Sequence, residues 1–232
     1  MSNAYITQDF QLSAIHTYNL DIKNREVYLH SRMDSEEEQG VEFNSAVVFE
    51  KNIRYLNTVS SESILIHMHY PGGVWEDCLS IYDTIKYSKS SIIILGYAKV
   101  ESASSIILQA AKHRILMPNT HVLIHYGSMS IDDEHRAAKS SFEWSEKESK
   151  KMIDIFTEKC IPSPIAEERK WKKMMIKKHI MSQLANKSDW ILDAQEAVHY
   201  GFADGVLGNR KYTSIDALKK LKWLKLNMHT SI

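Results

Sequence analysis

The middle of the chain alternates short β-rich runs with segments of helical periodicity, and this alternation constrains the fold more than any other feature. The apolar runs are residues 64–69, 92–95 and 122–125. Glycines follow the first two, at Gly72-Gly73 and Gly96, and helical spacing separates the runs, with the second helix expected at residues 103–114. Three strands separated by two helices predict successive βαβ units and therefore an α/β fold with a mainly parallel sheet.

The flanking segments predict smaller parts around this unit. Residues 1–25 have no sustained period and are expected to form a flexible N-terminal arm. Residues 26–208 then make one domain, with a strand at 26–30, a helix at 42–57 and a helical insertion at about 134–185. The prolines at 162 and 164 divide that insertion into helices at about 134–159 and 166–185. Residues 209–232 predict a basic tail with a short helix.

Composition excludes several classes of protein. The 232 residues carry 29 Lys+Arg and 29 Asp+Glu, so there is no global positive charge to attract nucleic acid or an anionic membrane. Two cysteines, Cys78 and Cys160, are too few for a disulfide scaffold and have no metal-ligand spacing around them. With no apolar run long enough for a membrane span or a signal peptide, we expect a cytoplasmic protein without a metal or cofactor.

Candidate site residues follow the carboxyl ends of the predicted strands, where ligands bind in open parallel sheets. Gly73 belongs to a glycine pair whose amides can form an oxyanion hole, although a plain tight turn is the alternative. Ser102 precedes a helix and is either a nucleophile, with the amide of Ala103 beside it, or an N-cap. His125 is either a general base or a core histidine. Asp189 is one of several carboxylates able to orient it.

Four motifs in order resemble those of the Clp protease proteolytic subunit family. They are Tyr70-Pro-Gly-Gly-Val74, the helix segment 80–84, the segment 114–125 that ends on His125, and Glu196-Ala-Val-His-Tyr-Gly-Phe-Ala-Asp204. The similarity covers roughly residues 26–125 and 186–208. It implies a ClpP/crotonase-like spiral of βαβ units with a helical handle, and a serine endopeptidase that acts on unfolded polypeptides without a cofactor.

Carried over position by position, the resemblance implies a catalytic triad and an oxyanion hole. Ser102 would be the nucleophile, His125 the base and Asp189 the orienting carboxylate, with the amides of Gly73 and Ala103 binding the oxyanion. Ser104 and Ser105 compete with Ser102, because the segment 96–102 is longer than the family's compact loop. An ungapped count would instead place Val100 at the catalytic position and describe an inactive subunit.

The resemblance also implies partners. Heptameric rings of this chain, stacked as a tetradecamer, would enclose the sites. A separate AAA+ unfoldase would supply any ATP dependence, since the chain shows no phosphate-binding lysine loop. The departures from the family's pattern are Ser188 in place of an arginine, the sequence 126–129 after His125, a longer basic helical insertion and an unlike N-terminal arm.

Three other functions remain open at this point. A catalytically inactive subunit of a mixed ring would account for the altered nucleophile loop. An acyl-CoA enzyme of the crotonase type shares a two-amide oxyanion hole but leaves Ser102, His125 and Asp189 without a joint role. A serine/lysine dyad of the signal-peptide-peptidase type would need a lysine in place of His125 and a membrane segment.

Overall fold

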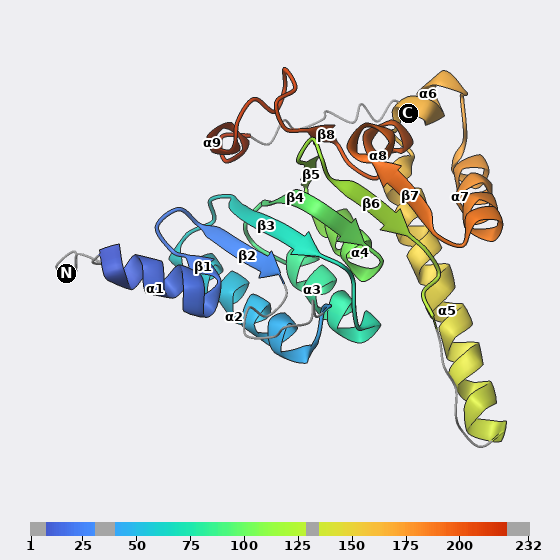
Figure 1. The fold of residues 1–232 in the computed structure, drawn as a ribbon, viewed down its shortest axis with the longest axis horizontal. Helices are drawn as coiled ribbons and strands as arrows, with labels where there is room; N and C mark the ends of the chain where they lie inside the picture. The colour runs from blue at the N-terminus through green and yellow to red at the C-terminus, as the bar shows by residue number, and fades with distance from the viewer. Residues whose placement is uncertain (1–7, 31–39, 129–134, 222–232) are drawn as a thin grey trace, which may run out of the picture.

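The computed structural model describes residues 8–30, 40–128 and 135–221. Figure 1 shows a twisted sheet with helices packed beside it and one long helix, α5, that extends away from the body. In chain order the elements are α1 (Gln8–Tyr18), β1 (Leu20–Asp21), β2 (Glu26–His30), α2 (Phe43–Val59), β3 (Ile64–Tyr70), α3 (Trp75–Lys86), β4 (Ile92–Glu101), α4 (Ala103–Ala110), β5 (His113–Leu116), β6 (His121–Ile124), α5 (His135–Cys160), α6 (Pro164–Glu168), α7 (Lys173–Lys187), β7 (Trp190–Asp193), α8 (Ala194–Tyr200), β8 (Gly205–Val206) and α9 (Ile215–Leu218).

The sheet runs in the order β1-β2-β3-β4-β5-β8, and β6 pairs with both β4 and β7. Strands β2 to β6 pair in parallel, while β1 and β7 are antiparallel additions. On the edge away from β3, the long strand β4 pairs with two strands in succession. Residues 93–96 pair with β5, and residues 99–101 pair with β6. The prediction of an α/β fold with a mainly parallel sheet is confirmed.

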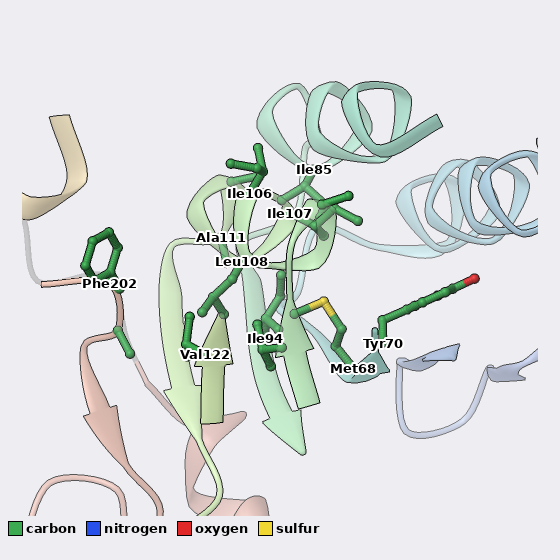
Figure 2. Close-up of a cluster of buried hydrophobic side chains, with 14 of the residues drawn as sticks. Met68, Tyr70, Ile85, Ile94, Ile106, Ile107, Leu108, Ala111, Val122 and Phe202 are labelled. Carbon is green, nitrogen blue, oxygen red and sulfur yellow. The ribbon is translucent and has the colours of Figure 1, made fainter. Parts of the chain in front are cut away.

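The main core lies between the sheet and the helices α2, α3 and α4. Figure 2 shows Met68 and Ile94 on the strands with Ile85 of α3 and Ile107 of α4 among the buried side chains. All eight residues of α4 are buried. Five of these residues are apolar, and the polar side chains of Ser104, Ser105 and Gln109 donate hydrogen bonds to backbone carbonyls, so that burial leaves them paired.

A second, smaller apolar cluster covers the opposite face of the sheet. It consists of Leu65, Ile93, Leu95, Ile115, Tyr212 and Leu218. Beside it, both oxygens of the Glu26 carboxylate accept hydrogen bonds, one from His67 Nε2 at 3.1 Å and one from Lys219 Nζ at 2.6 Å. The chain segment that contains α9 is therefore held on this face by apolar packing and by an ion pair.

Two of the expected element boundaries are wrong. The helix expected at residues 103–114 ends at Ala110, and His113–Leu116 is strand β5, because these residues pair with β4. A short apolar run does not distinguish a buried helix from a strand, so tertiary pairing decides. Strand β4 does not stop at Gly96 but continues to Glu101.

Other segments differ from expectation in detail. The helix expected at 166–185 is two helices, α6 and α7, separated near Lys170, whose φ is 53°. Part of the expected N-terminal arm is folded, as α1 and β1, and the side chain of Asn52 donates to the carbonyl of Tyr18 at 2.7 Å. In the tail, α9 spans four residues, and residues 222–232 of the predicted tail helix lie outside the described part of the chain.

The C-terminal part of the domain has the expected start and stop signals. Asp193 and Glu196 form a reciprocal capping box at the start of α8, and Gly201 ends that helix in the left-handed conformation with φ 87°. Within residues 8–30, 40–128 and 135–221, no helix is both long and apolar enough to cross a membrane.

Candidate active site

Ser102 lies in a sharp turn between the end of β4 and the start of α4. Its backbone adopts φ 51° and ψ −121°, a conformation that non-glycine residues rarely take. The amide of Ser102 donates to the carbonyl of Leu123 at 2.9 Å, which ties the turn to strand β6. The strained backbone therefore presents the Ser102 hydroxyl beside the end of β6.

A bulge in β4 explains why the segment 96–102 is long. Met68 pairs with Gly96 and Tyr70 pairs with Val100, so β3 advances two residues while β4 advances four. The two extra residues are absorbed in this irregularity, where Ala98 has φ 41°. Val100 is a fully buried strand residue, and it is Ser102 that lies beside His125.

The hydroxyls of the two competing serines are committed to backbone carbonyls of residues that precede α4. The hydroxyl of Ser104 lies 2.8 and 2.7 Å from the carbonyl oxygens of Tyr70 and Glu101, which share its single proton, and the hydroxyl of Ser105 donates to the carbonyl of Ser102 at 2.6 Å. Both residues are buried. Of the three serines, Ser102 is the one beside a histidine.

His125 directly follows β6 and turns its ring toward Ser102. The distance from His125 Nε2 to Ser102 Oγ is 2.7 Å. On the other side of the ring, Nδ1 lies 3.1 Å from Oδ1 of Asp189. A neutral imidazole that donates from Nδ1 to the carboxylate presents an unprotonated Nε2 to the serine hydroxyl.

Asp189 is placed by strand pairing and by a tight turn. Strand β7 is antiparallel to β6, and Trp190 pairs with Ile124, so the residues one step beyond, Asp189 and His125, face each other across the end of the pair. Ser188 has φ 56° and ψ −65°, and the amide of Asp189 donates to the carbonyl of Lys187 at 2.6 Å, which closes a γ-turn. The Asp189 side chain is 57% exposed.

The glycine pair after β3 is packed closely on both sides. A Cβ on Gly72 would lie 2.6 Å from Cβ of Ser102, and a Cβ on Gly73 would meet the backbone of Val41. Their φ angles of 109° and 140° also favour glycine. Val41 donates to the carbonyl of Gly72 and accepts from the amide of Val74, so the amide of Gly73 takes no part in this bridge.

The other amide expected to form an oxyanion hole, beside that of Gly73, belongs to Ala103, the first residue of α4. The first amides of a helix have no intrahelical acceptor and carry the positive end of the helix dipole. The thiol of Cys78 lies below Ala103 and donates to its carbonyl at 3.1 Å. Burial raises the pKa of this thiol, so Cys78 is a packing residue and not a candidate nucleophile.

Ser102 and His125 lie at a groove of about 980 Å³ between the loop after β3 and residues 140–152 of α5. Sequence reasoning missed several residues of its walls, among them Trp75, Glu76, Trp144 and Glu148. One sequence signal could have identified the α5 wall. Residues at helical spacing share one face of a helix, and the groove is lined by Ser141, Ser145, Glu148 and Met152. The described residues contain no group of three or more His, Cys, Asp or Glu side chains arranged to hold a metal ion.

Comparison with known proteins finds a family model and several relatives that agree with one another. The sequence model of the Clp protease family matches residues 13–210. The chain is 33% identical over 168 residues to the ATP-dependent Clp protease proteolytic subunit 2 of Treponema denticola, covering 70% of this chain and 76% of that protein. It is 29% identical over 110 residues to the corresponding subunit of Carsonella ruddii, covering 47% and 53%. It is 25% identical over 159 residues to subunit 1 of Tropheryma whipplei, covering 66% and 68%.

Proposed function

The chain belongs to the Clp protease family, and from this premise we propose that it is an active serine endopeptidase with Ser102 as its nucleophile. Family membership indicates a peptidase. Two contacts support the assignment of Ser102 as nucleophile. Ser102 Oγ lies 2.7 Å from His125 Nε2, and His125 Nδ1 lies 3.1 Å from Oδ1 of Asp189. An inactive subunit has no need of these two contacts.

The proposed reaction proceeds through an acyl-enzyme. His125 Nε2 takes the hydroxyl proton of Ser102 as Oγ attacks the scissile carbonyl carbon, and a tetrahedral oxyanion forms. When the C–N bond breaks, the same Nε2 gives the proton to the leaving amine. Water then enters, loses a proton to Nε2 and attacks the ester, and the proton returns to Oγ as the carboxylic acid leaves.

The remaining groups stabilise the charges that develop. The carboxylate of Asp189 accepts from Nδ1–H of His125, which keeps the reactive tautomer and stabilises the imidazolium. The amides of Gly73 and Ala103 would donate to the oxyanion, and loss of one such donor typically raises the barrier by about 3 kcal/mol. The bridge from Val41 supports this function of Gly73, because it holds the loop without using the Gly73 amide.

The nucleophile is tested by labelling the full chain with a fluorophosphonate probe, followed by peptide mapping. We expect one labelled peptide, with the label on Ser102, and no label in Ser102→Ala. Ser105→Ala is a matched control from the first turn of α4 and should still be labelled. A label on Ser104, or labelling that persists in Ser102→Ala, would contradict the assignment.

We further propose that the chain forms heptameric rings stacked as a tetradecamer, with the sites inside a chamber and unfolded polypeptides delivered by an AAA+ unfoldase. The extension of α5 beyond the body supports an assembly contact there (Figure 1), as does the exposure of Phe142 on that helix. Native mass spectrometry should detect the tetradecamer. A monomer under all conditions would contradict the assembly, and a stable ring without probe labelling would favour the inactive subunit. A cytoplasmic location stays a prediction.

A further inference from the structure

We propose that the groove beside Ser102 selects a basic side chain, arginine or lysine, on the residue that supplies the scissile carbonyl. This inference rests on the proposed function and names the substrate class of the same site. It is drawn from the charge, the aromatic walls and the size of the groove.

The carboxylates that line the groove are not matched by basic side chains among the described residues of its walls. Its described walls carry two carboxylates, Glu76 at the start of α3 and Glu148 on α5, and no lysine or arginine. The rest of α5 is rich in lysine, yet Lys147, Lys150 and Lys151 do not line the groove. An apolar side chain placed here would desolvate carboxylates without pairing them, whereas a basic side chain supplies the missing countercharge.

Glu148 is positioned to receive a cation. The indole N–H of Trp75 donates to Oε2 of Glu148, a bond that joins α3 to α5 across the groove. In the described part of the chain, Oε1 of Glu148 has no hydrogen-bond donor of its own. A guanidinium or ammonium group can therefore bind Oε1 while Trp75 continues to hold the carboxylate in place.

The aromatic and small residues of the walls suit a long cationic side chain. The indoles of Trp75 and Trp144 line the groove, and an aromatic ring can attract a cation, as the ring of Trp144 does with Lys147 Nζ at 5.9 Å from its centroid. Met152 provides an apolar contact for a methylene stem. Between them α5 contributes four small hydroxyl residues, Ser140, Ser141, Ser145 and Ser149. These leave room for an extended side chain and offer acceptors to its N–H groups.

The test uses fluorogenic peptides that differ only in the residue before the scissile bond, with arginine, lysine, leucine, phenylalanine and glutamate compared by kcat/KM. We expect arginine and lysine to exceed leucine by about tenfold or more. Glu148→Gln keeps an acceptor for the Trp75 indole but removes the charge, so the ratio of arginine to leucine should fall below about threefold. Glu146→Gln, an exposed residue of α5 that does not line the groove, should leave the ratio unchanged.

The outcomes separate this inference from the proposed function. If Ser102 is labelled and peptides are hydrolysed, but leucine equals or exceeds arginine or Glu148→Gln leaves the ratio unchanged, the selection of basic residues is wrong and the peptidase assignment stands. If no peptide is hydrolysed, the function fails, and calorimetric titration of the Ser102→Ala chain decides the inference. There the arginine peptide should bind about tenfold more tightly than the leucine peptide, and equal affinities would overturn the proposal.

Discussion

Oδ1 of Asp189 lies 3.1 Å from Nδ1 of His125, across the ends of two antiparallel strands. The two residues are 64 positions apart in the chain. The contact depends on the register of β6 with β7 and on the γ-turn at Ser188. A carboxylate held in this way is placed to orient the imidazole toward Ser102.

Replacing Asp189 with asparagine should lower peptide turnover without unfolding the chain. An amide can hold the imidazole in the unreactive tautomer, and the loss in a buried triad is about 10⁴-fold. Because Asp189 is 57% exposed, water screens its charge, and we expect a smaller loss of about 10² to 10³-fold. The measurement is kcat/KM together with the melting temperature. Asp83→Asn, on the exposed side of α3, is the control, and unchanged turnover in Asp189→Asn would remove Asp189 from the triad.

Replacing Gly73 with alanine should remove an oxyanion donor. The new Cβ would meet the backbone of Val41 and lie 2.8 Å from the carbonyl carbon of Gly40, so the loop must shift and its amide must turn. Peptide turnover should fall about 10² to 10³-fold. Gly208→Ala is the matched control, because Gly208 also has a positive φ of 93° but has open space around its Cβ position. Equal turnover in the two variants would show that the Gly73 amide is not used.

Glu26 should make the fold sensitive to acid. Hydrogen bonds from His67 and Lys219 hold the pKa of Glu26 at about 2, although burial opposes this shift. A depressed carboxyl pKa stabilises the fold above the unfolded value near 4.5, and this contribution is lost as pH falls from there toward 2. Urea unfolding should show Glu26→Gln to be about 1 to 3 kcal/mol less stable at pH 7, with the difference shrinking below pH 4.5. A difference that does not vary with pH would contradict this account.

Lys159 is expected to destabilise the fold at neutral pH. Burial, and secondarily the charge of Arg114, lowers its pKa to about 8. The folded state therefore disfavours the charged form, and stability should rise as pH increases from about 8 toward the unfolded value near 10.5. Lys159→Met should raise the free energy of unfolding by about 1 to 3 kcal/mol at pH 7, even though it loses the bond to the Ala111 carbonyl. The gain should diminish above pH 8, and a less stable variant at pH 7 would show that the bond outweighs the burial of charge.

Local patterns predicted much of the fold because they depend on neighbouring residues. The β-rich run before Gly72 and the capping residues of α8 act within a few positions, so their effects are readable from the sequence. The strand β5 was not readable in this way. Residues 113–116 form a strand because β4 and β8 provide hydrogen-bonding partners on both sides.

The candidate site also combines residues that the sequence predicts with contacts that it does not predict. The sequence by itself determined a parallel α/β domain and the serine, histidine and glycine residues that follow its strands, because these depend on period, turn chemistry and order along the chain. Only the tertiary structure decided that Ser102, and not Val100, Ser104 or Ser105, lies beside His125. A bulge in β4 moves Val100 into the strand, and the hydroxyls of Ser104 and Ser105 bind backbone carbonyls instead. The tertiary structure also brought Asp189 to His125 and Glu148 to Trp75, because strand register and helix packing join residues that the chain keeps far apart.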